Sequence, residues 1–183
     1  MITERPTHIQ ERQEFGHYEG DFIVSGKNGS GALLVLEERK TRRVFVARVS
    51  DRSATAVNAL IGTMLVGAPI RSITLDNDIS FVKHEALSAL ISADVYFTRP
   101  YTSQDKGGVE NRNKAMREFV PKGCDISQVD DETICSAVTH LNTRYMKCLE
   151  WQTPLEAWDA EVAAWCANEV RARVRKNAQC AVV

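Results

Sequence analysis

Three acidic residues occupy positions from which side chains could carry out metal-dependent chemistry. Asp21 opens a short strand-like run, Asp76 follows another, and Glu110 lies early in an expected helix. Because carboxylates held close together repel one another, a shared cation is the natural means of neutralising them. Oxygen ligands without neighbouring His or Cys favour Mg²⁺ or Mn²⁺, and two such ions can promote phosphodiester chemistry. We therefore expect two ions, with Asp21 bridging both and with Asp76 and Glu110 each holding one.

These acids must be positioned by a sheet, and the chain alternates strand and helix patterns accordingly. Strands are expected at 21–24, 32–37, 44–49, 72–75 and 94–98, and helices at 53–66, at 81–91 and around Glu110. This order predicts an α/β fold in which a mixed five-stranded sheet has an antiparallel meander and a parallel half. Ligands of open sheets gather at strand ends near a change of strand order. Adjacent first and fourth strands would therefore bring Asp21 and Asp76 side by side.

The helix that carries Glu110 has two distinct faces. Helical spacing places Glu110 on one side together with an amide and two cations, Asn113, Lys114 and Arg117. The other side carries an apolar set, Val109, Met116, Phe119 and Val120, as a core-facing helix does. Alone, Glu110 is better explained by an intrahelical ion pair. Only together with Asp21 and Asp76 does it become a candidate metal ligand.

The chain ends are expected to flank one domain. The polar residues 1–14 predict an extended arm or linker stub, residues 15–160 the core, and residues 161–183 a helical, basic tail. An apolar set with helical period, Ile134, Val138, Leu141, Tyr145 and Leu149, predicts one helix. A capping box with proline, 153–156, begins the next. Trp151, Trp158 and Trp165, spaced by seven, are better explained as anchors of the core than as a partner-binding face.

Composition limits the functional classes. A chain of 183 residues with 44% apolar residues and a net charge of −1 is typical of one ordinary globular domain. A DNA partner would have to be met by local basic patches. Five scattered cysteines predict reduced thiols of the cytosol. The polar start lacks the features of a signal peptide, and the uncharged segment 53–70 follows the spacing of a core helix better than that of a membrane span.

Several short motifs resemble those of one known family. The segment 11–24, which contains Asp21, resembles the start of the catalytic core of insertion-sequence-thirty family transposases, relatives of retroviral integrases. The Glu-Arg-Lys-Thr-Arg segment ending at Arg42 and the Asp76-Asn77 pair also resemble family motifs. Gly107, Glu110 and Asn113 match its G-x-x-E-x-x-N helix, and 121–123 and 153–157 match landmarks downstream. The interval between Asp76 and Glu110 has the family's length.

The resemblance implies an RNase H-like fold, that of the integrase catalytic core, with a helical C-terminal extension. It implies a transposase that frees 3′-hydroxyls at element ends and joins them to target DNA. Asp21, Asp76 and Glu110 become the catalytic, metal-binding acids of this enzyme. Mg²⁺ or Mn²⁺ is the implied cofactor, DNA the partner, and an oligomer of at least two copies the active assembly. The implied location is the bacterial cytosol, in association with the nucleoid.

Other polar residues are candidate ligand-supporting or DNA-contacting groups. Asn77 and Asn113 adjoin the acids, and a set of cations could bind phosphates without reading sequence, namely Lys106, Lys114, Arg117, Arg42 and Arg43. The cations of 39–43 are equally well explained as an exposed hairpin tip. His17 is better explained as a packed structural residue than as a metal ligand.

The chain also departs from the family pattern. Asp78 stands where glycine is usual; Asp tolerates a left-handed turn, but it adds negative charge beside the metals. Ile79, Ser80, Arg99 and the loop 102–106 differ as well. None of these changes removes a candidate ligand.

Three hypotheses follow for the function. Nothing before Arg5 could form the helix-turn-helix region with which family members recognise element ends, so we expect a catalytic core without that region. One hypothesis is an active transposase core. Another is an inactive remnant that binds DNA or a transposase, and a third, less favoured by the motifs, is an RNase H-like nuclease.

Overall fold

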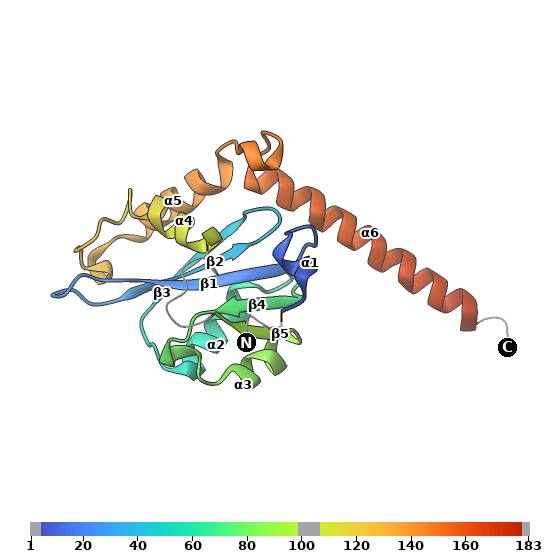
Figure 1. The fold of residues 1–183 in the computed structure, drawn as a ribbon, viewed down its shortest axis with the longest axis horizontal. Helices are drawn as coiled ribbons and strands as arrows, with labels where there is room; N and C mark the ends of the chain where they lie inside the picture. Colours follow the sequence, from blue (N-terminus) through green and yellow to red (C-terminus); the bar gives the residue numbers. More distant parts are fainter. Residues whose placement is uncertain (1–4, 99–106, 181–183) are drawn as a thin grey trace.

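The computed structural model describes residues 5–98 and 107–180 and consists of a sheet covered by helices on both faces (Figure 1). The strands are β1 (His17–Val24), β2 (Ala32–Glu38), β3 (Val44–Val49), β4 (Ser72–Leu75) and β5 (Asp94–Phe97). The α-helices are α1 (Thr7–Gln10), α2 (Ala54–Met64), α3 (His84–Ile91), α4 (Gly107–Met116), α5 (Asp131–Thr143) and α6 (Pro154–Cys180). Short 3-10 helices lie at η2 (Ile79–Phe81), η4 (Ile126–Gln128) and η5 (Lys147–Leu149).

The sheet has five strands in the order β3-β2-β1-β4-β5. β1, β2 and β3 pair antiparallel, whereas β1, β4 and β5 pair parallel. The change of direction falls at β1 and β4, where a crossover through α2 returns the chain to the other side of β1. The predicted mixed sheet, with its antiparallel meander and parallel half, is confirmed.

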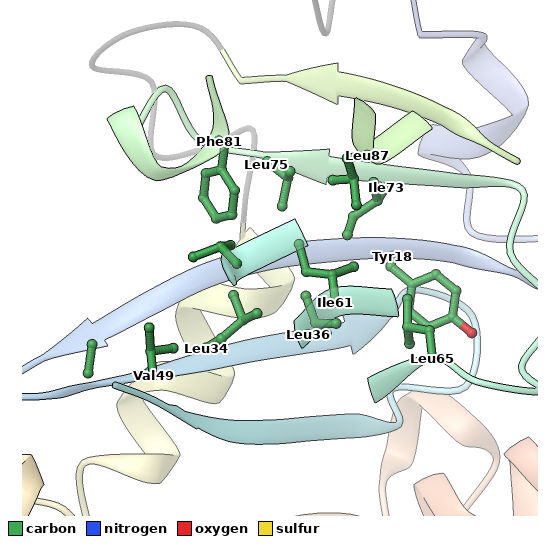
Figure 2. Close-up of a cluster of buried hydrophobic side chains, with 12 residues drawn as sticks. Tyr18, Leu34, Leu36, Val49, Ile61, Leu65, Ile73, Leu75, Phe81 and Leu87 are labelled. Carbon is green, nitrogen blue, oxygen red and sulfur yellow. The ribbon is translucent and has the colours of Figure 1, made fainter. Parts of the chain in front are cut away.

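Alternating residues of the strands supply two cores, one on each face. Leu34 and Leu36 of β2 pack with Ile61 of α2 on one face, and Figure 2 shows these side chains between the strands and the helix. Leu33 and Val35 point the other way, towards α4 and α5. Since every residue of β2 is buried, this strand is apolar along most of its length rather than alternating.

Odd-numbered residues of β1 face α4 and α5. Ile23 belongs to the core on that side and Tyr18 to the opposite core, so the two-residue period of the strand places Asp21 with Ile23. Gly20 lies between close neighbours, because a Cβ there would come 2.6 Å from a Leu75 methyl carbon. The sheet thus presents Asp21 on the face that α4 covers.

Capping residues set the helix starts that the sequence predicts. The hydroxyl of Ser53 accepts a hydrogen bond from the amide of Ala56 at the start of α2. In the capping box of α6, Thr153 Oγ1 accepts from the amide of Glu156 at 3.1 Å, and Glu156 Oε2 accepts from the amide of Thr153 at 2.8 Å. The predicted start at Pro154 is confirmed.

The largest differences between predicted and observed elements lie in β1, α3 and α5. β1 begins at His17 rather than Asp21, because it pairs with β4 from that residue. The helix predicted at 81–91 is divided into η2 and α3, where Asp78 caps the first part. α5 ends at Thr143, so the helical period that was extended to Tyr145 and Leu149 is wrong there, and Tyr145 is exposed.

The segment 5–14 packs on the domain instead of forming an extended arm. Ile9 of α1 is buried, and Arg5 Nη1 donates to Thr74 Oγ1 of β4 at 3.1 Å. A buried apolar side chain and a long cationic side chain thus help to dock a segment whose composition is mostly polar.

The three tryptophans lie in different environments, and the guanidinium of Arg71 lies over the ring of Trp165 in α6. Trp158 of α6 packs edge-on against Phe15 and Phe45, as a core anchor does. Trp151 precedes the helix and is 66% exposed, so its predicted role as an anchor is wrong. α6 then continues across residue 160 without a break and extends away from the sheet (Figure 1). No helix of the described residues is long and apolar enough to cross a membrane.

Candidate metal-dependent active site at the ends of β1 and β4

Asp21 lies in β1, and Asp76 directly follows the neighbouring strand β4. The parallel register of β1 and β4 pairs His17 with Ser72 and Glu19 with Thr74, and the same offset, continued two residues beyond the paired region, would place Asp21 beside Asp76. Neighbouring strands lie about 4.8 Å apart. Both residues are partly exposed. The strand order and the register therefore agree with the prediction that the two acids are neighbours on the face of the sheet that α4 covers.

Helix α4 contributes an amide to this pair of acids. Asn113 Nδ2 donates to Asp21 Oδ2 at 2.9 Å. The other face of α4 is buried in the core through Val109 and Met116, which are fully inaccessible, and this packing turns the polar face towards β1. Position 110 belongs to α4, but the side chain of Glu110 and all of Lys106 lie outside the described residues.

The turn after β4 is held by its own side chains. Asn77 Nδ2 donates to the carbonyl of Thr98 at 2.7 Å, which ties the ends of β4 and β5 together. The Asp78 amide donates to Asp76 Oδ1 at 3.2 Å, and this contact fixes one oxygen of the second acid. These two hydrogen bonds hold the turn that carries Asp76.

Asp78 does not adopt the expected left-handed turn. Its φ of −67° and ψ of 142° are extended, and its side chain accepts from the amide of Ser80 to cap η2. Although burial opposes ionisation, hydrogen bonds from Ser80 and the charge of Arg52 hold the pKa of Asp78 below its ordinary value. Arg52 Nη2 lies 2.7 Å from Asp78 Oδ2. Arg52 thus compensates the negative charge of Asp78, which stands where family members usually have glycine.

A buried ion pair supports the start of α4. Glu19 and Arg39 are 1% and 4% exposed and form a close salt bridge. Glu19 Oε2 also accepts from the amide of Val109 at 3.4 Å, one of the amides that a helix start leaves without a partner inside the helix. Arg39 Nε in turn donates to the carbonyl of Ile9 at 3.3 Å. This pair links the docked segment, β1 and α4.

The basic segment 39–43 therefore is not the exposed hairpin tip that its composition allows. Arg39 and Thr41 are buried. Lys40 Nζ lies 2.5 Å from Glu161 Oε1 of α6, and the guanidinium of Arg43 lies over the ring of Phe45. Glutamates on β1 and on α6 thus form ion pairs with Arg39 and Lys40. The periodicity of the sequence alone does not reveal these partners.

A second buried acid, Glu37, lies close to two arginines. Glu37 Oε1 lies 3.6 Å from Arg42 Nη1 and 3.4 Å from Arg112 Nε. Arg112 is 4% exposed and its Nη2 donates to Met146 Sδ at 3.3 Å. Arg112 is therefore a core residue that joins α4 to β2.

Burial raises the pKa of Glu37 to about 7, in opposition to the charges of Arg112 and Arg12. Between the ordinary pKa of a glutamate and about pH 7, Glu37 therefore keeps its proton in the folded chain and has lost it in the unfolded chain. The stabilising contribution of this proton is complete below about pH 4.5 and is lost as the pH rises through about 7.

We expect the free energy of unfolding of the wild type, relative to a Glu37→Gln variant, to fall by about 3 kcal/mol between about pH 4.5 and about pH 7. Urea denaturation of both proteins across this range measures the difference. The exposed Glu118→Gln change serves as the control and should give a flat difference. A flat curve for Glu37→Gln would contradict the raised pKa.

Lys114 of α4 and Arg117, which follows that helix, are both predicted to contact DNA, but their surroundings differ. Lys114 is exposed. Arg117 Nη2 donates to the carbonyl of Val24 at 2.9 Å, and its Nη1 to that of Pro121 at 3.3 Å. Arg117 therefore links the chain after α4 to the end of β1. The side chain of Lys114 is exposed to solvent.

Sequence reasoning missed Glu19 and Glu37 as buried partners. A signal for Glu19 was present, since it stands two residues before Asp21 and therefore on the same face of β1. No spacing rule could have indicated that Arg39 and Arg112 would be enclosed beside these acids, because each pair joins separate elements.

Curated relatives of the chain are bacterial transposases. The transposase for insertion sequence element IS4351 of Bacteroides fragilis is 37% identical over 157 residues, which are 85% of this chain and 48% of the relative. The transposase for IS1086 of Cupriavidus metallidurans is 35% identical, with 83% and 45% covered. Transposase InsI for IS30A of Escherichia coli is 29% identical, with 88% and 43% covered. The chain spans about half the length of these relatives. No protein-family model matches it.

Solved structures of retroviral integrases share the fold. The catalytic core domain of BIV integrase aligns with a TM-score of 0.62 at 17% identity, covering 81% of this chain and 97% of that domain. A chain of the simian T-cell lymphotropic virus intasome, solved with a PP2A regulatory subunit, aligns with a TM-score of 0.64 at 15% identity, covering 78% and 53%. By sequence the chain belongs to the insertion-sequence-thirty family of transposases, and it has the RNase H-like fold of the integrase catalytic core.

Proposed function

We propose that this chain is the catalytic core of a DNA transposase, which cleaves phosphodiester bonds at the ends of a mobile element and joins the freed 3′-hydroxyls to target DNA. The observation that carries the proposal is the hydrogen bond from Asn113 of α4 to Asp21, supported by the parallel pairing of β1 with β4, whose register leads from Asp21 towards Asp76. The names of the curated relatives, transposases for insertion sequences, support the same activity.

We assign Asp21, Asp76 and Glu110 as the ligands of two divalent ions, Mg²⁺ or Mn²⁺. The side chains at this edge offer hard oxygen donors, as these ions prefer. Among the described residues, Asn113 Oδ1 is also buried without a hydrogen-bond partner, so an oxygen acceptor beside Asp21 is available to a ligand or to water. When bound, the ions would activate the attacking oxygen and stabilise the leaving one.

The residues around the acids would hold them in position. Asn113 orients the carboxylate of Asp21 through Oδ2, and the Asp78 amide orients that of Asp76 through Oδ1. The bond from the Val109 amide to Glu19 anchors the backbone next to Glu110. Position 110 lies three residues before Asn113, on the same helix face, which supports its assignment as the third acid.

DNA would approach over α4. Lys114 is exposed beside this edge, and we retain it, with Lys106, as a phosphate contact that positions DNA without reading its sequence. We assign Arg42, Arg43 and Arg117 to packing, since they have partners within the fold. The active assembly is proposed to contain at least two copies of the chain.

Incubation of supercoiled plasmid and element-end DNA with Mg²⁺ or Mn²⁺ tests the proposal. The wild type is expected to nick DNA and to join 3′ ends to the plasmid, whereas Glu110→Gln should lower both rates at least about a hundredfold, as loss of a metal ligand does. Glu118→Gln makes the same chemical change at an exposed position and should leave both rates unchanged.

The outcomes separate the competing functions. Equal behaviour of the wild type and Glu110→Gln would overturn the enzyme assignment and favour an inactive remnant that binds DNA or a transposase. Cleavage that depends on Glu110 but never yields joined products would favour an RNase H-like nuclease.

A further inference from the structure

Two histidines and a glutamate converge where the segment 5–14 meets the sheet. His8 lies in α1, Glu14 in the following link, and His17 at the start of β1. Glu14 Oε2 lies 3.4 Å from His8 Nε2 and 2.9 Å from His17 Nε2. One donor atom from each residue lies within 4.8 Å of the other two. Two ring nitrogens and a carboxylate oxygen thus point at one small region.

We propose that His8, Glu14 and His17 bind one Zn²⁺ ion, which fastens the segment 5–14 to the start of β1. Zinc takes imidazole nitrogen at about 2.0–2.1 Å and carboxylate oxygen at about 2.0–2.2 Å in tetrahedral sites, so donors around it lie about 3.3 Å apart. The separations of Glu14 Oε2 from the two histidines already approach that value. Nitrogen donors also distinguish this set from the all-oxygen acids that suit Mg²⁺.

The proposed ligating atoms His17 Nε2 and Glu14 Oε2 are hydrogen-bonded to each other, while the other polar atoms of these two residues contact the rest of the fold. His17 Nδ1 lies 2.7 Å from Ser72 Oγ in the buried start of β4, and a hydrogen bond at the far ring nitrogen is the usual support of a zinc-bound histidine. The two carboxylate oxygens of Glu14 have different neighbours. Oε1 lies 3.3 Å from Arg71 Nη1, whereas Oε2 faces the histidines. Arg71 is itself held by its Nε, which donates to the carbonyl of Phe15 at 3.1 Å.

This cluster is separate from the proposed active site. His17 precedes Asp21 by four strand residues, about 13 Å along β1. The fourth position of the zinc ion would be open to water, since His8 and Glu14 are partly exposed, with 59% and 36% of their side chains accessible. The site would act structurally, by adding a link between α1 and the sheet to those that Arg5 and Arg39 already make.

Titration of the metal-free full chain with ZnCl₂ in a calorimeter, in excess Mg²⁺ to occupy the acidic site, tests the proposal. We expect one ion per chain. His8→Ala and Glu14→Gln should each weaken its binding by more than about tenfold, since even supporting residues of metal sites cost this much. His140→Ala removes an exposed histidine of α5 and should leave binding unchanged. Hydrogen exchange of residues 5–14 should slow with Zn²⁺ in the wild type and not in His8→Ala.

Substitution of Co²⁺ identifies the donor atoms. The expected visible spectrum is that of a tetrahedral nitrogen and oxygen site, without the near-ultraviolet band of thiolate ligands. A thiolate band would assign the ion to exposed cysteines such as Cys135 or Cys148 and overturn the proposal. Binding that His8→Ala and Glu14→Gln leave intact, or no binding at all, would overturn it too and would make the cluster a hydrogen-bonded contact only. Neither result bears on strand transfer.

Discussion

Replacing Asp76 by asparagine is expected to lower the rate of strand transfer about a thousandfold, because a metal ion at a reacting phosphate contributes several kcal/mol and each 1.4 kcal/mol is a factor of ten. Asn keeps the size of the side chain and an oxygen that can accept from the Asp78 amide. The fold should therefore persist while the charge that attracts the cation is lost. Single-turnover strand transfer, with circular dichroism of the same samples, measures both properties.

Asp78→Asn is the matched control, with the same substitution two residues away. Asn is as good a helix cap as Asp, so η2 should keep its start. The ion pair with Arg52 would be lost, but both partners are partly exposed, and such pairs contribute little. The rate should change less than about threefold, by less than 1 kcal/mol. If Asp78→Asn impaired transfer as much as Asp76→Asn, the assignment of Asp76 as the second ligand would fail.

Replacing Glu19 by alanine is expected to destabilise the fold by about 3–5 kcal/mol, because it leaves the Arg39 guanidinium buried without a countercharge. Burial already lowers the pKa of Arg39 to about 9, with the charges of Arg5 and Arg12 acting in the same direction. The Val109 amide would lose its acceptor as well. Chemical denaturation measures the change in the free energy of unfolding.

A second pair from the same segment provides the comparison. Lys40 and Glu161 are 33% and 27% exposed, so Glu161→Ala should cost less than about 1 kcal/mol. A Glu19→Leu, Arg39→Met double variant removes both buried charges and should recover part of the loss. If Glu19→Ala cost no more than Glu161→Ala, the buried pair could not be what anchors the start of α4.

Much of the fold follows from local patterns. The strand at Ser72–Leu75 and the start of α6 at Pro154 lie where the sequence predicts them, because a β-branched run and a capping box are local signals. The structural features that the sequence predicts wrongly depend on contacts between residues that are distant in the chain. α5 stops at Thr143 although its apolar period continues, and Ile9 docks a segment that is polar by composition.

The candidate site is predictable only in part. Asp21 and Asp76 could be expected to be neighbours once the strand order was inferred, and the parallel register of β1 and β4 agrees with that expectation. The bond from Asn113 to Asp21 depends on how α4 is rotated against the sheet. The surroundings of Arg39 and Arg112 could not be foreseen, since a cation next to other cations gives no sign of a glutamate brought to it from another strand.

By itself, the sequence predicted the family from its short motifs, the mixed sheet from periodicities of two and 3.6, and three candidate acids from residue types at the expected strand and helix ends. Only the tertiary structure decided which charged residues are buried. Arg39 pairs with Glu19, and Arg112 with Glu37, across elements that are distant in the chain. The burial of an ionised side chain is determined by the partners that folding assembles around it, and residue type and spacing do not encode that assembly locally.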